Sequence, residues 1–105
     1  MGNNRASERY AKSLLMLSID EKITEEIKGD IDLIIDSFSK SREISSLYLS
    51  PIIPIKHKIS ITKKIFTGKI HNHTLNLLLN LIIRKRDSLI EAILSKFNEL
   101  YNAYM

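Results

Sequence analysis

The spacing of the apolar residues most constrains the fold of this chain, because it follows the helical repeat over most of the length. The most regular stripe runs through Leu89, Ile90, Ile93, Leu94, Phe97, Leu100, Tyr101 and Tyr104. Only three glycines and two prolines interrupt the 105 residues, too few for an all-β fold of many tight turns. With 18 Ile and 14 Leu, the chain has enough apolar side chains for one core. We therefore predict a single all-α domain over residues 1–105.

Breaks in the apolar pattern divide the chain into six predicted helices, which makes the expected fold a six-helix bundle. The helices are expected at about residues 6–19, 24–38, 42–48, 54–66, 72–84 and 87–104. Residues 58–62 alternate like a strand, but a lone strand would have no partner, so a helix is predicted there as well. Asp20 or Thr24 can cap the second helix, and Asn72 or Thr74 the fifth. Gly68 is free to adopt a left-handed conformation after the fourth.

The first and fifth predicted helices carry more apolar residues than one core-facing stripe needs. The first has two apolar rows: Tyr10, Leu14 and Leu17, and Ala11, Leu15 and Ile19. Together these rows cover roughly 220° of the helix. The fifth is apolar over roughly 240° and leaves a polar strip of Asn76, Asn80 and Arg84. If the two helices pack side by side, the surplus forms a groove suited to an amphipathic helix. The alternative is that both helices are simply central in the bundle.

The charges are distributed unevenly along the chain. Residues 44–86 contain no acid and eight bases, whereas the remainder holds eight bases and all twelve acids. The bases of this stretch are Lys56, Lys58, Lys63, Lys64, Lys69, Arg84, Lys85 and Arg86. Such a stretch fits nucleic acid, an acidic lipid surface, an acidic protein partner or an ordinary solvated face. A basic helical nucleic-acid-binding domain is therefore the alternative function. Phe66, the aromatic residue among these bases, is expected in the core, which disfavours single-strand stacking.

The sequence offers little for catalysis or metal binding. It has no cysteine, no glycine-rich phosphate loop and no nucleophile paired with a base. His71 and His73 form an H-x-H pair without a third ligand nearby. The acids of the second helix are expected on a solvated outer face; they are Glu25, Glu26, Asp30, Asp32 and Asp36. We predict no catalytic residue, no metal and no cofactor, and thus a binding domain.

Four segments carry a family resemblance. They are Arg9-Tyr10-Ala11-Lys12-Ser13-Leu14, then Pro51-Ile52-Ile53-Pro54 with Lys58 and Ile65-Phe66, then Thr74-Leu75-Asn76-Leu77-Leu78, and finally Arg86 with Phe97 and Tyr101. In this order they resemble the R-Y-A-K-A-L, N-P-x-I … K … I-F, T-x-N-F-L and R … F … Y motifs of the ATP synthase delta subunit family. Its mitochondrial member is called the oligomycin-sensitivity-conferring protein. The resemblance extends from about residue 5 to 104, and it implies the family's amino-terminal six-helix domain.

The resemblance also implies a partner. In the family, helices one and five hold the amphipathic amino-terminal helix of an alpha subunit at the top of the catalytic head. The subunit is not catalytic; it links the head to the peripheral stalk of the ATP synthase. By position, the residues expected in the groove are Tyr10, Ala11, Leu14, Asn76, Leu79, Asn80 and Ile83.

Further expectations follow from the same resemblance. The peripheral-stalk b subunit would be bound by the family's carboxy-terminal region, which is not found in these 105 residues. The expected location is the cytoplasmic face of the bacterial inner membrane, reached only through the complex, with no role in nucleic-acid binding. One position departs from the family, because Lys85 stands where glycine is common. We expect either a mildly strained left-handed Lys85 or two nearly continuous helices at this junction.

Overall fold

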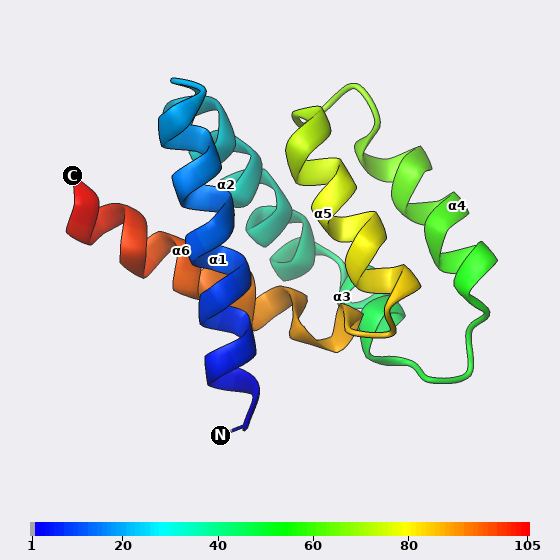
Figure 1. Cartoon of the computed structure of the whole chain (residues 1–105). Helices are drawn as coiled ribbons and strands as arrows, with labels where there is room; N and C mark the ends of the chain where they lie inside the picture. Colours follow the sequence, from blue (N-terminus) through cyan, green and yellow to red (C-terminus); the bar gives the residue numbers. More distant parts are fainter. Residues whose placement is uncertain (1) are drawn as a thin grey trace.

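The computed structural model describes the backbone of residues 2–105 and the side chains of residues 5–105. The helices are α1 (Gly2–Asp20), α2 (Thr24–Lys40), α3 (Arg42–Leu49), α4 (Ile55–Phe66), α5 (Asn72–Ile83) and α6 (Ile90–Tyr104). A one-turn 3-10 helix, η1 (Asp87–Leu89), precedes α6 (Figure 1). Residues 2–105 contain no strand, and the alternating stretch at 58–62 lies within α4. The predicted all-α six-helix bundle is therefore confirmed.

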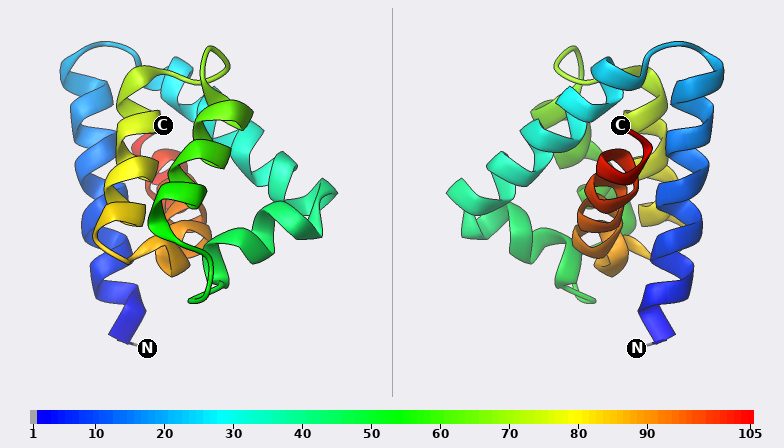
Figure 2. Two further views of the ribbon diagram at one scale, coloured as in Figure 1. Left: turned by 90° about the vertical axis from the view of Figure 1, so that its right-hand side faces the viewer. Right: turned by 90° about the vertical axis from the view of Figure 1, so that its left-hand side faces the viewer.

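The arrangement of the helices leaves one face of the α1–α5 pair uncovered by other helices. In Figure 2, α1 and α5 run side by side in opposite directions, and α4 lies on the side of α5 that faces away from α1. Helix α6 crosses behind this layer and packs most extensively against α1, while α4 packs against α5. The prediction that helices one and five are neighbours thus agrees with the arrangement in the bundle.

The core is formed by one buried row from each long helix. Ile27, Ile31 and Ile34 of α2 are fully buried, as is Phe97 of α6. The buried residues of α1 are Ser7, Ala11, Leu14, Leu15 and Ser18. Three of these five side chains are small, which permits a close approach between the backbones of α1 and α6. The core therefore uses the row of α1 that contains Ala11 and Leu15, together with Leu14 from the other row.

The caps of α2 and α5 differ from those predicted. Ile23 occupies the N-cap of α2 and its side chain makes no cap hydrogen bond, so neither Asp20 nor Thr24 is the cap. At α5 the cap is His71, whose Nδ1 accepts a hydrogen bond of 3.0 Å from the backbone N–H of His73. Asn72 is the first helical residue of α5. The hydroxyl of Thr74 is already engaged as a donor to Asp30, as described next.

Asp30 does not lie on the solvated face where the sequence predicts it. It is buried, and its Oδ2 accepts hydrogen bonds from Thr74 Oγ1 at 2.7 Å and from the backbone N–H of His71 at 2.9 Å. The carboxylate thus lies at the amino-terminal end of α5, where free N–H groups and the helix dipole favour negative charge. This interaction compensates the burial of the charge and ties α2 to α5.

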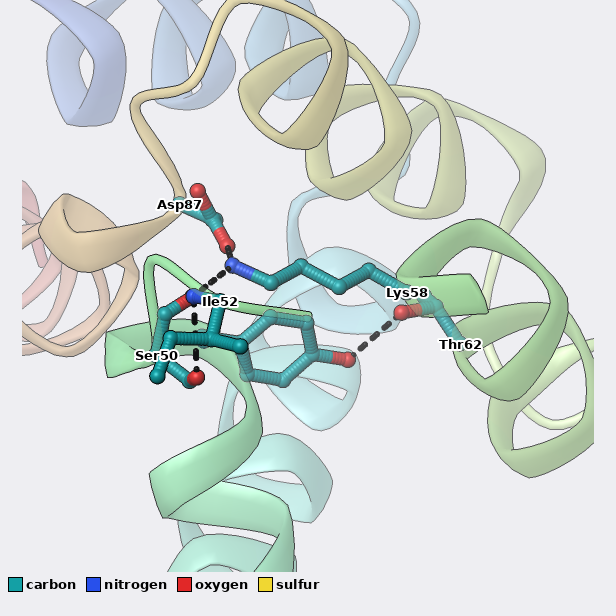
Figure 3. Close-up of polar contacts among 6 residues, drawn as sticks. Ser50, Ile52, Lys58, Thr62 and Asp87 are labelled. Atoms are coloured by element: carbon teal, nitrogen blue, oxygen red, sulfur yellow. Dashed lines mark hydrogen bonds and ion pairs between the residues drawn. The ribbon is translucent and has the colours of Figure 1, made fainter. Parts of the chain in front are cut away.

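The sequence-based prediction is also wrong for Lys58, because this residue is not part of an exposed basic cluster. Its side chain is buried, and its Nζ lies 2.6 Å from Asp87 Oδ2 and 2.7 Å from the backbone oxygen of Ser50 (Figure 3). A charge can be buried at this position because both a carboxylate and a carbonyl oxygen accept from the ammonium group.

The turns at Gly68 and Lys85 both use the left-handed region. Gly68 has φ +80°, as predicted, and Lys85 has φ +60°. The N–H of Lys85 donates to Ile82 O, and the N–H of Arg86 donates to Leu81 O, which is a Schellman-type helix end. Of the two alternatives for this junction, the structure has the left-handed lysine. No helix within residues 2–105 is both long and apolar enough to cross a membrane.

Candidate functional site

A surface hollow of about 360 Å³ lies between α1 and α5, and we term it the α1–α5 groove. Its lining residues are Tyr10, Ser13, Leu14 and Leu17 of α1, and His73, Asn76, Leu77 and Asn80 of α5. In both helices these positions are spaced i, i+3, i+4 and i+7, so each helix contributes one continuous face. The leucines give the groove an apolar floor, and the exposed Asn76 and Asn80 provide amide groups along one side.

Two side-chain hydrogen bonds lie at opposite ends of the groove, and each joins one of its helices to a residue that follows the other. At one end, Arg86 Nη1 donates to the Tyr10 hydroxyl at 2.8 Å. At the other end, His73 Nε2 lies 2.9 Å from Glu21 Oε1. Because an ionised carboxylate only accepts, His73 Nε2 carries the proton in this contact. The two helices are antiparallel, so the residues after α5 lie beside the start of α1 and the residues after α1 lie beside the start of α5 (Figure 2).

The structure brings four of the seven predicted site residues together. Tyr10, Leu14, Asn76 and Asn80 all line the groove. Ala11 is 0% exposed and belongs to the core. Leu79 is half-buried and Ile83 is 56% exposed, and neither lines the groove. On a helical wheel Leu79 lies roughly 110° and Ile83 roughly 70° from the centre of the face of α5 that is turned toward the groove.

The residues of the groove that sequence reasoning did not single out are Ser13, Leu17, His73 and Leu77. A usable signal was present for α5: the polar strip of Asn76 and Asn80 shares one helix face with His73 and Leu77. The sequence predicts the groove from the apolar surplus of the fifth helix. The groove face is instead mixed, with the strip of amides beside a single leucine.

The groove offers contacts for binding, and its histidine is already engaged with Glu21. Among residues 5–105, no group of three or more His, Asp or Glu side chains is placed to hold a metal ion. His71 uses Nδ1 to cap α5, and its ring packs against that of His73 with centroids 4.9 Å apart. The chemistry available in the groove is therefore apolar contact and amide hydrogen bonding, as in a receptor for an amphipathic segment.

A second hollow, of about 530 Å³, continues from the groove at the Tyr10 end, and we term it the arginine hollow. Its lining residues are Ala6, Arg9, Tyr10, Ser13, Arg84 and Arg86. Burial raises the pKa of the Tyr10 hydroxyl, but the hydrogen bonds and charges of Arg86 and Arg84 outweigh this, so the pKa lies below its ordinary value. This direction is the mark of a positive local potential.

The basic stretch of residues 44–86 does not act as one unit. Lys58 is withdrawn into an ion pair, whereas Lys63 and Lys64 are exposed in the last turn of α4. Arg84 and Arg86 face the arginine hollow with Arg9, a residue from outside the stretch. Loss of Lys58 from the surface weakens the case for a continuous phosphate-binding cluster and hence for the nucleic-acid alternative.

Comparison with known proteins identifies the family. The family model of the ATP synthase delta (OSCP) subunit matches residues 6–105. ATP synthase subunit delta of Chlorobaculum tepidum is 31% identical over 100 residues, which cover 95% of this chain and 55% of that protein. Its counterpart from Cytophaga hutchinsonii is 29% identical over 105 residues, covering 100% and 58%. The chloroplastic subunit of Gracilaria tenuistipitata var. liui is 30% identical over 91 residues, covering 87% and 49%.

The chain thus spans about half the length of the curated relatives that it matches. The family match begins in α1 and continues to the end of α6, so it includes both helices of the groove. The motifs noted in the sequence lie within the same range, and the chain belongs to the ATP synthase delta (OSCP) subunit family.

Proposed function

We propose that this chain binds the amino-terminal helix of an ATP synthase alpha subunit in the α1–α5 groove. The observation that carries the proposal is the pair of helix faces that line the groove, each spaced i, i+3, i+4 and i+7. Two such faces side by side form a trough into which the apolar stripe of a third helix can pack. Membership in the ATP synthase delta family supports the identity of the partner.

Tyr10 is the proposed anchor of this contact. It lines both the groove and the arginine hollow, and its hydroxyl is held by Arg86 at 2.8 Å. A tyrosine that is fixed before binding contributes a large contact area and loses little conformational entropy when the ligand arrives. Asn76 and Asn80 are proposed to pair with polar groups at the edge of the bound helix. Of the residues expected from the sequence, Ala11, Leu79 and Ile83 then have secondary roles or none.

We further propose that the chain acts as a non-catalytic stator component that links the catalytic head to the peripheral stalk. In this role it needs no cofactor, and the chemistry of ATP takes place in other subunits. The contact with the b subunit is assigned to the carboxy-terminal part of family members, since the relatives are about twice as long as the matched segment. The proposed location is peripheral, at the cytoplasmic face of the bacterial inner membrane, through the assembled complex.

A peptide titration tests the proposal. The amino-terminal peptide of the alpha subunit from the same organism is titrated against the chain by isothermal calorimetry. We expect saturable one-to-one binding, weakened at least about tenfold by Tyr10→Asp and by Leu77→Asp. Ile52→Asp is the matched control, because Ile52 is an exposed apolar residue between α3 and α4 and lines neither the groove nor the arginine hollow. It should leave the affinity unchanged, and circular dichroism melts check that every variant is folded.

Two results would contradict the proposal. The first is the absence of saturable binding at a peptide concentration of about 500 μM. The second is loss of affinity in Ile83→Asp with none in Leu77→Asp, which would shift the interface around α5 to the row of Leu79 and Ile83. Leu79→Asp, at the half-buried position one turn before Ile83 in that row, reports how far the interface extends around the helix.

A further inference from the structure

The arginine hollow is a concentrated positive site without an internal counter-ion. Arg9 comes from α1, while Arg84 and Arg86 follow α5, and all three side chains are exposed. Within residues 5–105, none of the three forms a salt bridge with an acid, and Glu8, next to Arg9 in the sequence, pairs with none of them. Three guanidinium groups around one hollow repel one another, so an anionic ligand is favoured there.

The arginine hollow and the α1–α5 groove are parts of one continuous surface. They share Tyr10 and Ser13 as lining residues. From the arginine hollow the surface continues along Leu14 and Leu77 to His73 at the far end. A helix lying in the groove therefore extends its end, or the residues that flank it, over the three arginines.

In the part of the chain whose side chains are described, the opposite end of the groove lacks such a cluster of cations and is lined by Leu17 and His73. His73 is paired there with Glu21, which directly follows α1, and Asp20 and Lys22 are exposed on either side of Glu21. A ligand with acidic residues at that end would meet a histidine that is already paired with a carboxylate, whereas the same residues over the arginine hollow would meet three guanidinium groups. The groove thus distinguishes the two directions in which an amphipathic helix can bind.

We propose that the arginine hollow binds carboxylate side chains of the helix docked in the α1–α5 groove, and so sets the direction of that helix. This inference rests on the proposed function and adds the chemistry of the partner: an apolar stripe that ends in Asp or Glu residues. Guanidinium and carboxylate groups form paired, bidentate hydrogen bonds, which give orientation as well as attraction.

The test uses the alpha-subunit amino-terminal peptide and a form in which its Asp and Glu residues are replaced by Asn and Gln. Each peptide is titrated against the wild-type chain and Arg9→Gln/Arg84→Gln. Arg86 is left unchanged because it holds Tyr10. The control Lys12→Gln/Lys63→Gln removes the same net charge at exposed residues outside both hollows. We expect the arginine variant to bind the acidic peptide about tenfold more weakly, and the control to change the affinity less than twofold.

The charge dependence provides the second measurement. The neutralised peptide should bind the wild type and the arginine variant equally well, since the carboxylates that the arginines recognise are gone. Raising the salt concentration from about 50 to about 300 mM should lower the affinity of the wild type for the acidic peptide much more than the affinity of the arginine variant.

Other outcomes overturn the inference, each in a recognisable way. One such outcome is that the wild type and Arg9→Gln/Arg84→Gln bind the acidic peptide with equal affinity at both salt concentrations. That result would show that the arginine hollow does not bind carboxylates, and it would not contradict binding in the groove. If neither peptide binds the wild type, the proposed function fails along with the inference. If anionic phospholipid vesicles bind the wild type but not the arginine variant, and peptide affinity is unchanged, the arginines belong to a lipid contact instead.

Discussion

Lys58 Nζ lies 2.6 Å from Asp87 Oδ2, and this buried ion pair joins the first turn of α4 to the 3-10 helix that precedes α6 (Figure 3). The same Nζ donates to the backbone oxygen of Ser50, in the connection between α3 and α4. One ammonium group therefore ties α4 to the connection just before it and to the 3-10 helix at Asp87, 29 residues further along the chain. Removal of either charged partner leaves the other buried without its counter-ion, which is the costly case for an ion pair.

We predict that Asp87→Ala and Lys58→Met each lower the free energy of unfolding by about 3–5 kcal/mol. Urea denaturation, followed by circular dichroism, measures the change. Lys56→Met is the control, since Lys56 is exposed in the same turn of α4 and should change stability by less than about 0.5 kcal/mol. The double variant Lys58→Met/Asp87→Leu should recover much of the loss, because two apolar residues can replace a buried pair. A loss in the double variant equal to the sum of the single losses would contradict this account.

Asp30 provides the second prediction. Its carboxylate accepts from Thr74 and from the N–H of His71, so Asp30→Ala removes two charge-assisted hydrogen bonds and leaves two donors unpaired. We expect the free energy of unfolding to fall by about 2–3 kcal/mol, which should appear as a fall of roughly 10 °C in the melting temperature. Asp32→Ala, at an exposed i,i+4 pair with Lys28 on the same helix, should cost less than about 0.5 kcal/mol. Equal effects of the two substitutions would mean that Asp30 is not a link between α2 and α5.

These two buried charges also mark what the sequence could not predict. The helical repeat was enough to predict six helices, because each apolar row continues over several turns and each break contains Pro, Gly or a polar cluster. Burial of Asp30 and Lys58 depends instead on which groups from other helices lie opposite them. That information is tertiary, and the spacing of residues within one helix does not contain it.

The candidate site was predictable to a similar extent. The apolar surplus on the first and fifth helices pointed to the two helices that line the α1–α5 groove, and Tyr10 and Leu14 lie on the groove face of α1. The rotation of α5 about its own axis could not be read from composition, because that helix is apolar over most of its surface. The choice between the row of Leu79 and Ile83 and the row of Asn76 and Asn80 depends on how α4 and the core pack against α5.

Lys85 gives a prediction that links the backbone to the family resemblance. Its φ of +60° lies in the left-handed region, where residues with a Cβ are strained and glycine is not. We expect Lys85→Gly to raise the free energy of unfolding by about 0.5–1 kcal/mol, as measured by urea denaturation. Lys12→Gly is the control, since the same change inside α1 should lower stability by about 1 kcal/mol. If both substitutions destabilise the chain equally, the turn at Lys85 carries no strain.

The pKa values of Tyr10 and Tyr48 should be shifted in opposite directions from the ordinary value of tyrosine. Burial, and secondarily the charge of Asp87, raise the pKa of Tyr48 despite its 2.7 Å hydrogen bond with Thr62. The arginines lower the pKa of Tyr10, as described above. NMR of chains labelled with ¹³C at the tyrosine ζ carbon measures both values, and Tyr→Phe variants assign the signals. We expect Tyr10 to lose its proton at lower pH than Tyr48.

The same shifts determine how stability depends on alkaline pH. A raised pKa in the folded state means that the contribution of Tyr48 is fully present below the unfolded value of about 10 and is lost as pH rises through the folded pKa. Tyr10 acts in the opposite sense, with a contribution that is present above the unfolded pKa and lost as pH falls through the folded one. Tyr48→Phe should therefore flatten the fall of stability above about pH 10. Arg86→Gln should raise the pKa of Tyr10 and leave the pKa of Tyr48 unchanged. If the pKa of Tyr10 is unaltered in this variant, the arginine hollow does not create the positive potential at Tyr10.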